Sequence, residues 1–165
     1  MVIRSRRIVG TVSICVFALA LTQDGFYLDR VPRNAWAPGW GEFAVGWISL
    51  FSGTLAWLGN PLLIASWIAL FRKRVKGAAW FAFLAMLFML SFLLNKKIVD
   101  SEAGSEARIS GYGLGYWLWV LSSVVAAFGS LWVRADAADA APASKAIVDP
   151  KTGPAVSEGK GADTR

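Results

Sequence analysis

Between Phe43 and Phe71 the sequence reads FAVGWISLFSGTLAWLGNPLLIASWIALF, a run of 29 residues without a charge. Small side chains recur in this run at alternating spacings of three and four: Gly46, Ser49, Gly53, Ala56 and Asn60. Such spacing places them on one face of a helix. A run of this length is expected to lie in lipid, where a seam of small residues lets helices approach closely. The sequence therefore predicts an all-α integral membrane protein.

The central run is too long for one straight span. A helix of this length would measure about 43 Å, against a hydrocarbon core of roughly 30 Å. We predict a break at Pro61, because proline donates no N–H and its ring crowds the carbonyl of Trp57. Two interpretations of Trp57, Asn60 and Pro61 stay open. Asn60 belongs to a packed kink and bonds a neighbouring helix, or the turn unwinds and binds a small ligand or ion.

The amino-acid composition and the distribution of charge restrict the kinds of site that the chain can form. Histidine is absent and Cys15 is the single cysteine, so disulfides within the chain and metal sites built from histidine or thiolate are excluded. The net charge of +6 is concentrated in residues 1–7 and 72–77, each beside an apolar run. This distribution follows the positive-inside rule and does not indicate a nucleic-acid-binding surface. We predict no cofactor, no metal site and no nucleic-acid partner.

Four apolar segments predict four transmembrane helices in a compact bundle, at about residues 8–27, 43–71, 78–94 and 113–133. They make up one domain over residues 1–134, and residues 135–165 are predicted to be a disordered cytoplasmic tail. The first segment is interpreted as a retained helix, with a cleaved signal peptide as the alternative. The bias of Lys and Arg places both termini in the cytoplasm and the protein in the plasma (inner) membrane.

Two further patterns bear on helix packing. Ala78, Ala82 and Ala85 form a flat side of the third span. A second seam of small residues lies on the last span and is expected to face the seam of the central run: Ser122, Ala126 and Ser130.

The two segments on the outer side, residues 23–42 and 95–112, are expected to be an irregular re-entry loop and a solvated loop. Trp36, Trp40 and Tyr112 supply aromatic surface at the membrane boundary. We interpret these residues as an interfacial aromatic belt or, alternatively, as a surface that docks a partner protein.

Two sequence motifs of this chain are similar to those of a known group of proteins. With AWLGNPL at Ala56 to Leu62 and GYGLGYWLW at Gly111 to Trp119, the chain resembles a group of small four-span inner-membrane proteins of bacteria. The resemblance implies a four-span fold over Ile8 to Val133. It implies no activity and no site residues, because none is assigned in that group.

Among classes of function, the sequence favours a non-enzymatic interaction, assembly or accessory protein with a membrane or periplasmic protein as its partner. The alternative is a small transporter or channel subunit that works as a homo-oligomer, with its site at Asn60 and Pro61. Coupled transport normally requires ionisable groups within spans, and none is visible here. An enzyme acting on a lipid would use a carboxylate of the outer side, of which Glu42 is the best candidate.

Overall fold

The computed structural model describes residues 2–29, 39–99 and 106–147, and these are mostly helical. Within these ranges the chain forms five α-helices, three short 3-10 helices and three strands. The elements are α1 (Val2–Leu21), β1 (Phe26–Leu28), α2 (Gly39–Val45), η1 (Gly46–Ser52), η2 (Leu55–Leu58), α3 (Gly59–Phe71), α4 (Val75–Ser91), η3 (Phe92–Leu94), β2 (Lys97–Val99), β3 (Glu106–Tyr112) and α5 (Leu114–Ile147). The all-α prediction therefore fits most of the chain, and a small sheet is added to it.

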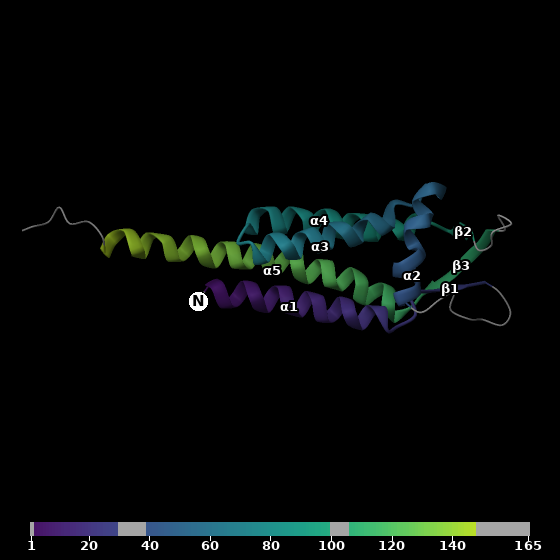
Figure 1. Ribbon diagram of the computed structural model, residues 1–165, viewed down its shortest axis with the longest axis horizontal. Helices are drawn as coiled ribbons and strands as arrows, with labels where there is room; N and C mark the ends of the chain where they lie inside the picture. Colours follow the sequence, from purple (N-terminus) through teal and green to yellow (C-terminus); the bar gives the residue numbers. More distant parts are fainter. Residues whose placement is uncertain (1, 30–38, 100–105, 148–165) are drawn as a thin grey trace, which may run out of the picture.

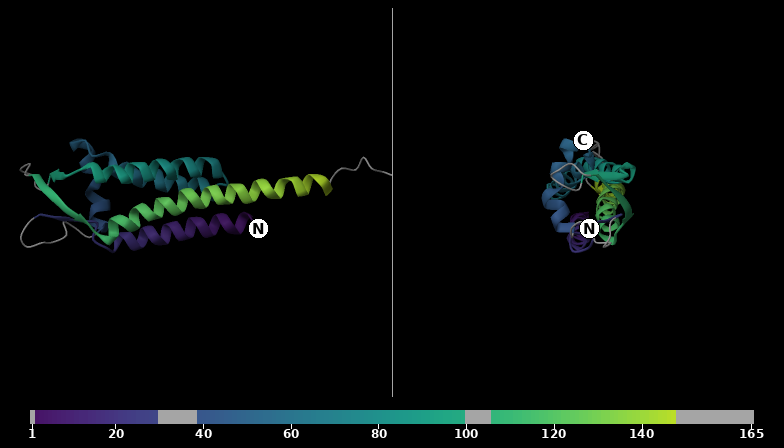
Figure 2. Two further views of the ribbon diagram at one scale, coloured as in Figure 1. Left: turned by 180° about the vertical axis from the view of Figure 1, so that it is seen from behind. Right: turned by 90° about the vertical axis from the view of Figure 1, so that its right-hand side faces the viewer.

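The four longest helices, α1, α3, α4 and α5, lie side by side along the long axis (Figure 1). Successive helices run in opposite directions, so the N-terminus and the α3–α4 turn share one end. We call this the basic end, after Arg6, Arg7 and Arg72 to Arg74. The opposite end carries α2 and the strands, and we call it the sheet end. Figure 2 shows α5 extending well beyond its neighbours at the basic end.

By length and composition, two helices within the described ranges can cross a membrane. They are α4 continued through η3, over Val75–Leu94, and the first part of α5, over Leu114–Ala135. The helix α1 does not meet this criterion, because three arginines occupy its first turns and leave a predominantly apolar run of only 14 residues, Ile8 to Leu21. The apolar helix Leu55–Phe71, formed by η2 and α3, is shorter than the other two.

The predicted break at Pro61 is wrong in its position. The central run divides at Gly53, whose φ of 83° is left-handed and closes η1 through hydrogen bonds back to Leu50 and Ser49. Glycine adopts this conformation without the steric cost that a side chain brings. Pro61 instead lies in the first turn of α3, where its missing N–H is tolerated. The predicted seam is divided among η1, η2 and α3, so it forms no single face.

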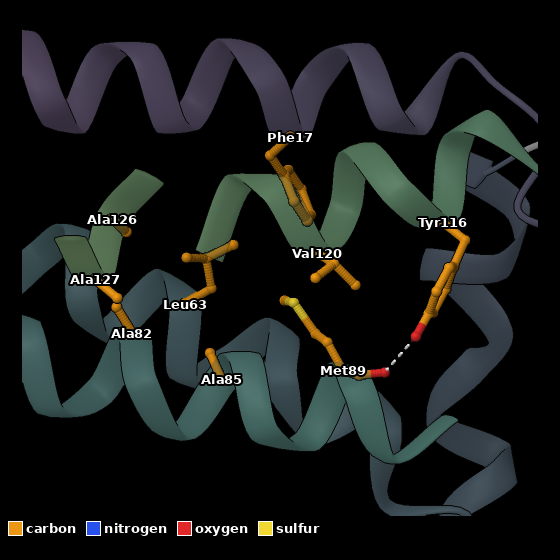
Figure 3. Packing of buried hydrophobic residues seen from close by; sticks show 9 residues of the cluster. All are labelled: Phe17, Leu63, Ala82, Ala85, Met89, Tyr116, Val120, Ala126 and Ala127. Atoms are coloured by element: carbon orange, nitrogen blue, oxygen red, sulfur yellow. Dashed lines mark hydrogen bonds between the residues drawn. The ribbon is translucent and has the colours of Figure 1, made fainter. Parts of the chain in front are cut away.

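The core of the bundle is built on small residues of α4 (Figure 3). Ala78, Ala82 and Ala85 are fully buried, which confirms the predicted flat side. The helix α5 packs chiefly against α1 and α4, and only slightly against α3. Its predicted seam is buried, but α1 and α4 cover it in place of the central run. The largest cluster of buried residues consists of Phe17, Leu63, Ala82, Ala85, Met89, Tyr116, Val120, Ala126 and Ala127.

Three antiparallel strands close the sheet end in the order β1-β3-β2. Phe26 pairs with Tyr112 in one ladder and Ile98 pairs with Ala107 in the other. Phe26, Leu28 and Ala107 form a buried cluster. The residues of the predicted solvated loop that the structure describes are thus largely β-structure, because they find a partner strand after α1. At the other end, α5 continues to Ile147, into the predicted tail, and residues 148–165 lie outside the described ranges.

Two glycines of the GYGLG motif bring the start of α5 against the segment that follows α1. The N–H of Gly113 donates to the Gly25 carbonyl at 2.7 Å, and the N–H of Gly115 donates to the Asp24 carbonyl at 2.9 Å. A Cβ atom at position 113 would collide with the Asp24 carbonyl oxygen. The motif is therefore a close backbone contact, which only residues without a side chain allow.

We expect Gly113→Ala to lower the free energy of unfolding by about 2 kcal/mol, because a backbone atom cannot yield to the added methyl group. Gly111→Ala is the matched control, since a Cβ atom at position 111 meets nothing within 4 Å. Reversible unfolding in mixed micelles measures the free energy of unfolding of both variants. Equal stability of the two variants would contradict this account of the motif.

Candidate functional site

The short helix α2 lies across the sheet end of the bundle (Figure 1). Its first residue is tied to the chain after α1, because the Gly39 N–H donates to the Gln23 carbonyl at 3.0 Å. This attachment directs Glu42, in the middle of α2, toward the segment Asp24 to Phe26.

The carboxylate of Glu42 sits against the backbone at the start of β1. It accepts hydrogen bonds from the N–H groups of Gly25 and Phe26. A Cβ atom at position 25 would collide with Oε2, so the carboxylate needs a glycine there. The other oxygen, Oε1, is buried without a hydrogen-bond partner. The Glu42 carboxyl group is therefore hydrogen-bonded to the backbone, while its Oε1 atom is buried away from water without a partner.

Burial raises the pKa of Glu42 from its ordinary 4.5 to about 7. The two backbone N–H groups lower this pKa, and the nearby charge of Asp24 raises it, but desolvation is the largest effect. A carboxyl group in this state exchanges its proton near neutral pH. Its geometry makes it a pH-dependent attachment between α2 and β1.

In the structure, Trp57, Asn60 and Pro61 have different surroundings. Asn60 is buried, with 4% of its surface exposed, and its Oδ1 accepts a hydrogen bond from the Trp119 indole N–H at 2.7 Å. The Trp57 indole N–H donates to the Phe43 carbonyl at 3.0 Å. Pro61 is exposed in the first turn of α3. The Asn60 oxygen thus joins α3 to α5, and the three residues do not converge on one site.

Further polar side chains join the helices, and sequence reasoning did not single them out. The Trp67 indole N–H donates to Ser13 Oγ at 2.9 Å, and Ser13 in turn donates to the Ser122 carbonyl at 2.8 Å. Ser66 Oγ donates to the Ala78 carbonyl at 2.9 Å. A lone serine within an apolar run was the available signal, since such a hydroxyl needs a partner in lipid.

The predicted partner surface is only partly described. Trp36 lies outside the described residues. Trp40 is 63% exposed on α2. Tyr112 packs against the rings of Phe92 and Tyr116 and its hydroxyl reaches the Phe92 carbonyl at 3.5 Å. Of the two described members, Trp40 is the more exposed.

No protein-family model, no curated protein and no solved structure matches this chain. Within the described ranges, no three Cys, Asp or Glu residues gather closely enough to hold a metal ion. The candidate site is therefore Glu42 and its backbone partners at the sheet end.

We expect the effects of Asn60→Ala and Trp119→Phe on the free energy of unfolding to be non-additive, because each substitution removes one partner of the same hydrogen bond. A double-mutant cycle in mixed micelles should give an interaction energy of about 1 kcal/mol. Trp132→Phe is the control, since Trp132 is exposed on the same helix. Additive effects of Asn60→Ala and Trp119→Phe would show that the bond contributes nothing to packing.

We expect the stability of the protein to fall as pH rises from 4.5 through about 7, the interval in which the folded state retains the Glu42 proton and the unfolded state loses it. The loss is on the order of 3 kcal/mol. Glu42→Gln cannot ionise and should show no fall from this source. The measurement is the unfolding midpoint across that interval, and parallel profiles for the two proteins would refute the assignment.

Proposed function

We propose that this chain is a multi-pass protein of the plasma (inner) membrane that acts by binding another protein, without enzymatic activity. The membrane placement is supported by the apolar surface of the helices. Only 22% of the candidate span in α4 is buried, whereas the core helix of a soluble protein is mostly buried. Large apolar side chains of all four long helices are exposed, among them Ile8, Ile68, Trp80 and Phe128. Lipid is the solvent that suits such a surface.

In this proposal α1 and α3 also span the membrane, beside the two longer helices. Both lie alongside α4 and α5 and overlap them along the long axis of the bundle (Figure 1). Arg6 and Arg7 of α1 reach the interface by extending their long side chains, and local thinning of the bilayer accommodates the shorter apolar lengths. The cations gathered at the basic end support a cytoplasmic position for that end and for both termini.

The observation that supports binding of a protein is the exposed apolar surface of α2 and η1 at the sheet end. It includes Trp40, Trp47, Ile48 and Phe51, of which Phe51 is 84% exposed. Glu42 holds this segment against β1 and so presents it at the outer interface. The partner that fits is a membrane or periplasmic protein with an apolar face at the same depth.

The alternative of an oligomeric transporter or channel has less support. Its candidate residue, Asn60, already bonds Trp119. The run Phe43 to Phe71 carries no ionisable group that could relay an ion. An enzymatic role for Glu42 has less support too, because the only ionisable neighbour recorded for it in the described part of the chain is the like-charged carboxylate of Asp24.

Crosslinking in native membranes, followed by purification, tests the proposal. We expect a stoichiometric partner with the unmodified protein and its loss with Trp40→Ala. Trp80→Ala is the matched control, since Trp80 is 67% exposed but lies on α4. Recovery of a partner with both variants would rule out the α2 surface, and recovery of the chain alone would favour the oligomeric alternative.

A further inference from the structure

A small cavity of about 60 Å³ opens at the basic end, where α1 meets the α3–α4 turn. Three cationic side chains and two apolar ones line it: Arg6, Arg7, Leu70, Phe71 and Lys73. The cations come from two separate segments of the chain, so the sequence does not reveal that they converge.

The position of Gly10 explains why α1 reaches the end of α3. A Cβ atom at Gly10 would lie 2.9 Å from Cζ of Phe71, so the absence of a side chain lets the two helices approach. Arg6 precedes Gly10 by one turn, on the same face of α1. The close approach at Gly10 therefore carries Arg6 to the last turn of α3.

Lys73 reaches the cavity from a strained turn. Its φ is 66°, the only positive φ of a non-glycine residue in the described part of the chain. The turn is a Schellman motif, in which Arg74 N–H bonds the Ala69 carbonyl at 2.8 Å and Lys73 N–H bonds the Leu70 carbonyl at 3.2 Å. Glycine is the usual residue at this position because it takes the left-handed conformation without penalty. A lysine here adds a cation to the cavity at the expense of backbone stability.

Among the residues whose side chains the structure describes, no acid lies in the helices that form the cavity. Arg6 Nε is buried and has no hydrogen-bond partner. The sequence has no Asp or Glu in residues 1–23, 43–99 or 114–135, which include every lining residue and the part of α5 whose side chains are described. Three like charges around one cavity, with an unsatisfied guanidinium donor among them, form a site that an anion would complete.

We propose that this cavity binds the phosphate group of an anionic lipid headgroup. Arg6 and Arg7 donate to its oxygens and Lys73 supplies a third cation. In the apolar wall Leu70 is buried, whereas Phe71 is 49% exposed and offers its ring to the lipid beyond the headgroup. A free phosphate ion offers the same chemistry to the cations but makes no use of the apolar wall. The site goes beyond the proposed protein-binding function, since it lies at the opposite end of the bundle.

Native mass spectrometry of the full-length protein tests this proposal, using micelles that contain equal amounts of phosphatidylglycerol and phosphatidylcholine. We expect selective retention of phosphatidylglycerol by the unmodified protein. Lys73→Gly removes a cation and relieves the strained φ, so it should weaken retention about fivefold without lowering the unfolding midpoint. Arg6→Gln, which keeps most of the side chain, should weaken retention to a similar extent.

Lys76→Ala is the matched control. It removes one positive charge from the same end, but Lys76 does not line the cavity, so retention should be unchanged. Equal losses in Lys73→Gly and Lys76→Ala would mean general attraction to the basic end and would overturn the proposal, as would equal retention of the two lipids.

Inorganic phosphate alone provides a second arm, read as a shift of the unfolding midpoint. A shift smaller than that of phosphatidylglycerol, and lost in Lys73→Gly, supports the lipid as the ligand. An equal or larger shift with phosphate would overturn the lipid assignment and identify a site for a free phosphate group. Because this arm needs no bilayer, it reports on the cavity even if the proposed membrane function fails.

Discussion

The close backbone contact between Asp24–Gly25 and Gly113–Gly115 is the constraint on which the rest of the structure depends. Two hydrogen bonds cross it, and a side chain at position 113 would collide with it. The contact joins the end of α1 to the start of α5, the two helices that pack most extensively. It also leaves β1 beside β3, so the sheet follows from it. Glu42 then finds backbone N–H groups at the one place where a second glycine, Gly25, leaves room.

A second constraint is the pairing of polar groups between helices. Several side-chain donors bond an oxygen on another helix: Trp67 to Ser13, Ser13 to Ser122, Ser66 to Ala78, Trp119 to Asn60 and Tyr116 to Met89. In lipid no water is available to form a hydrogen bond with an unpaired group of this kind. Each of these bonds therefore favours one register of the helices. The same pairing occupies the Asn60 oxygen. A residue that looks like a binding site in the sequence is thus part of the packing.

Charge divides the bundle into two ends with different chemistry. The sheet end carries both signs of charge, including a buried carboxyl group with a pKa of about 7. The basic end has cations that converge on a cavity, with no acid among its lining residues. An apolar surface separates the two ends along the helices. This arrangement supports our proposals that the bundle crosses a bilayer, binds lipid headgroups at one end and binds a protein at the other.

The sequence by itself determined the helical class, the alanine side of α4 and the position of the basic clusters, because these depend on local periodicity and composition. It misplaced the break of the central run, since proline is tolerated in a first turn and Gly53 takes the left-handed conformation that ends η1. The sheet, the Glu42 site and the cavity at Arg6 and Lys73 were decided only by the tertiary structure. Each joins residues far apart in the chain, and their strands, burial and unpaired donors exist only once the helices have packed.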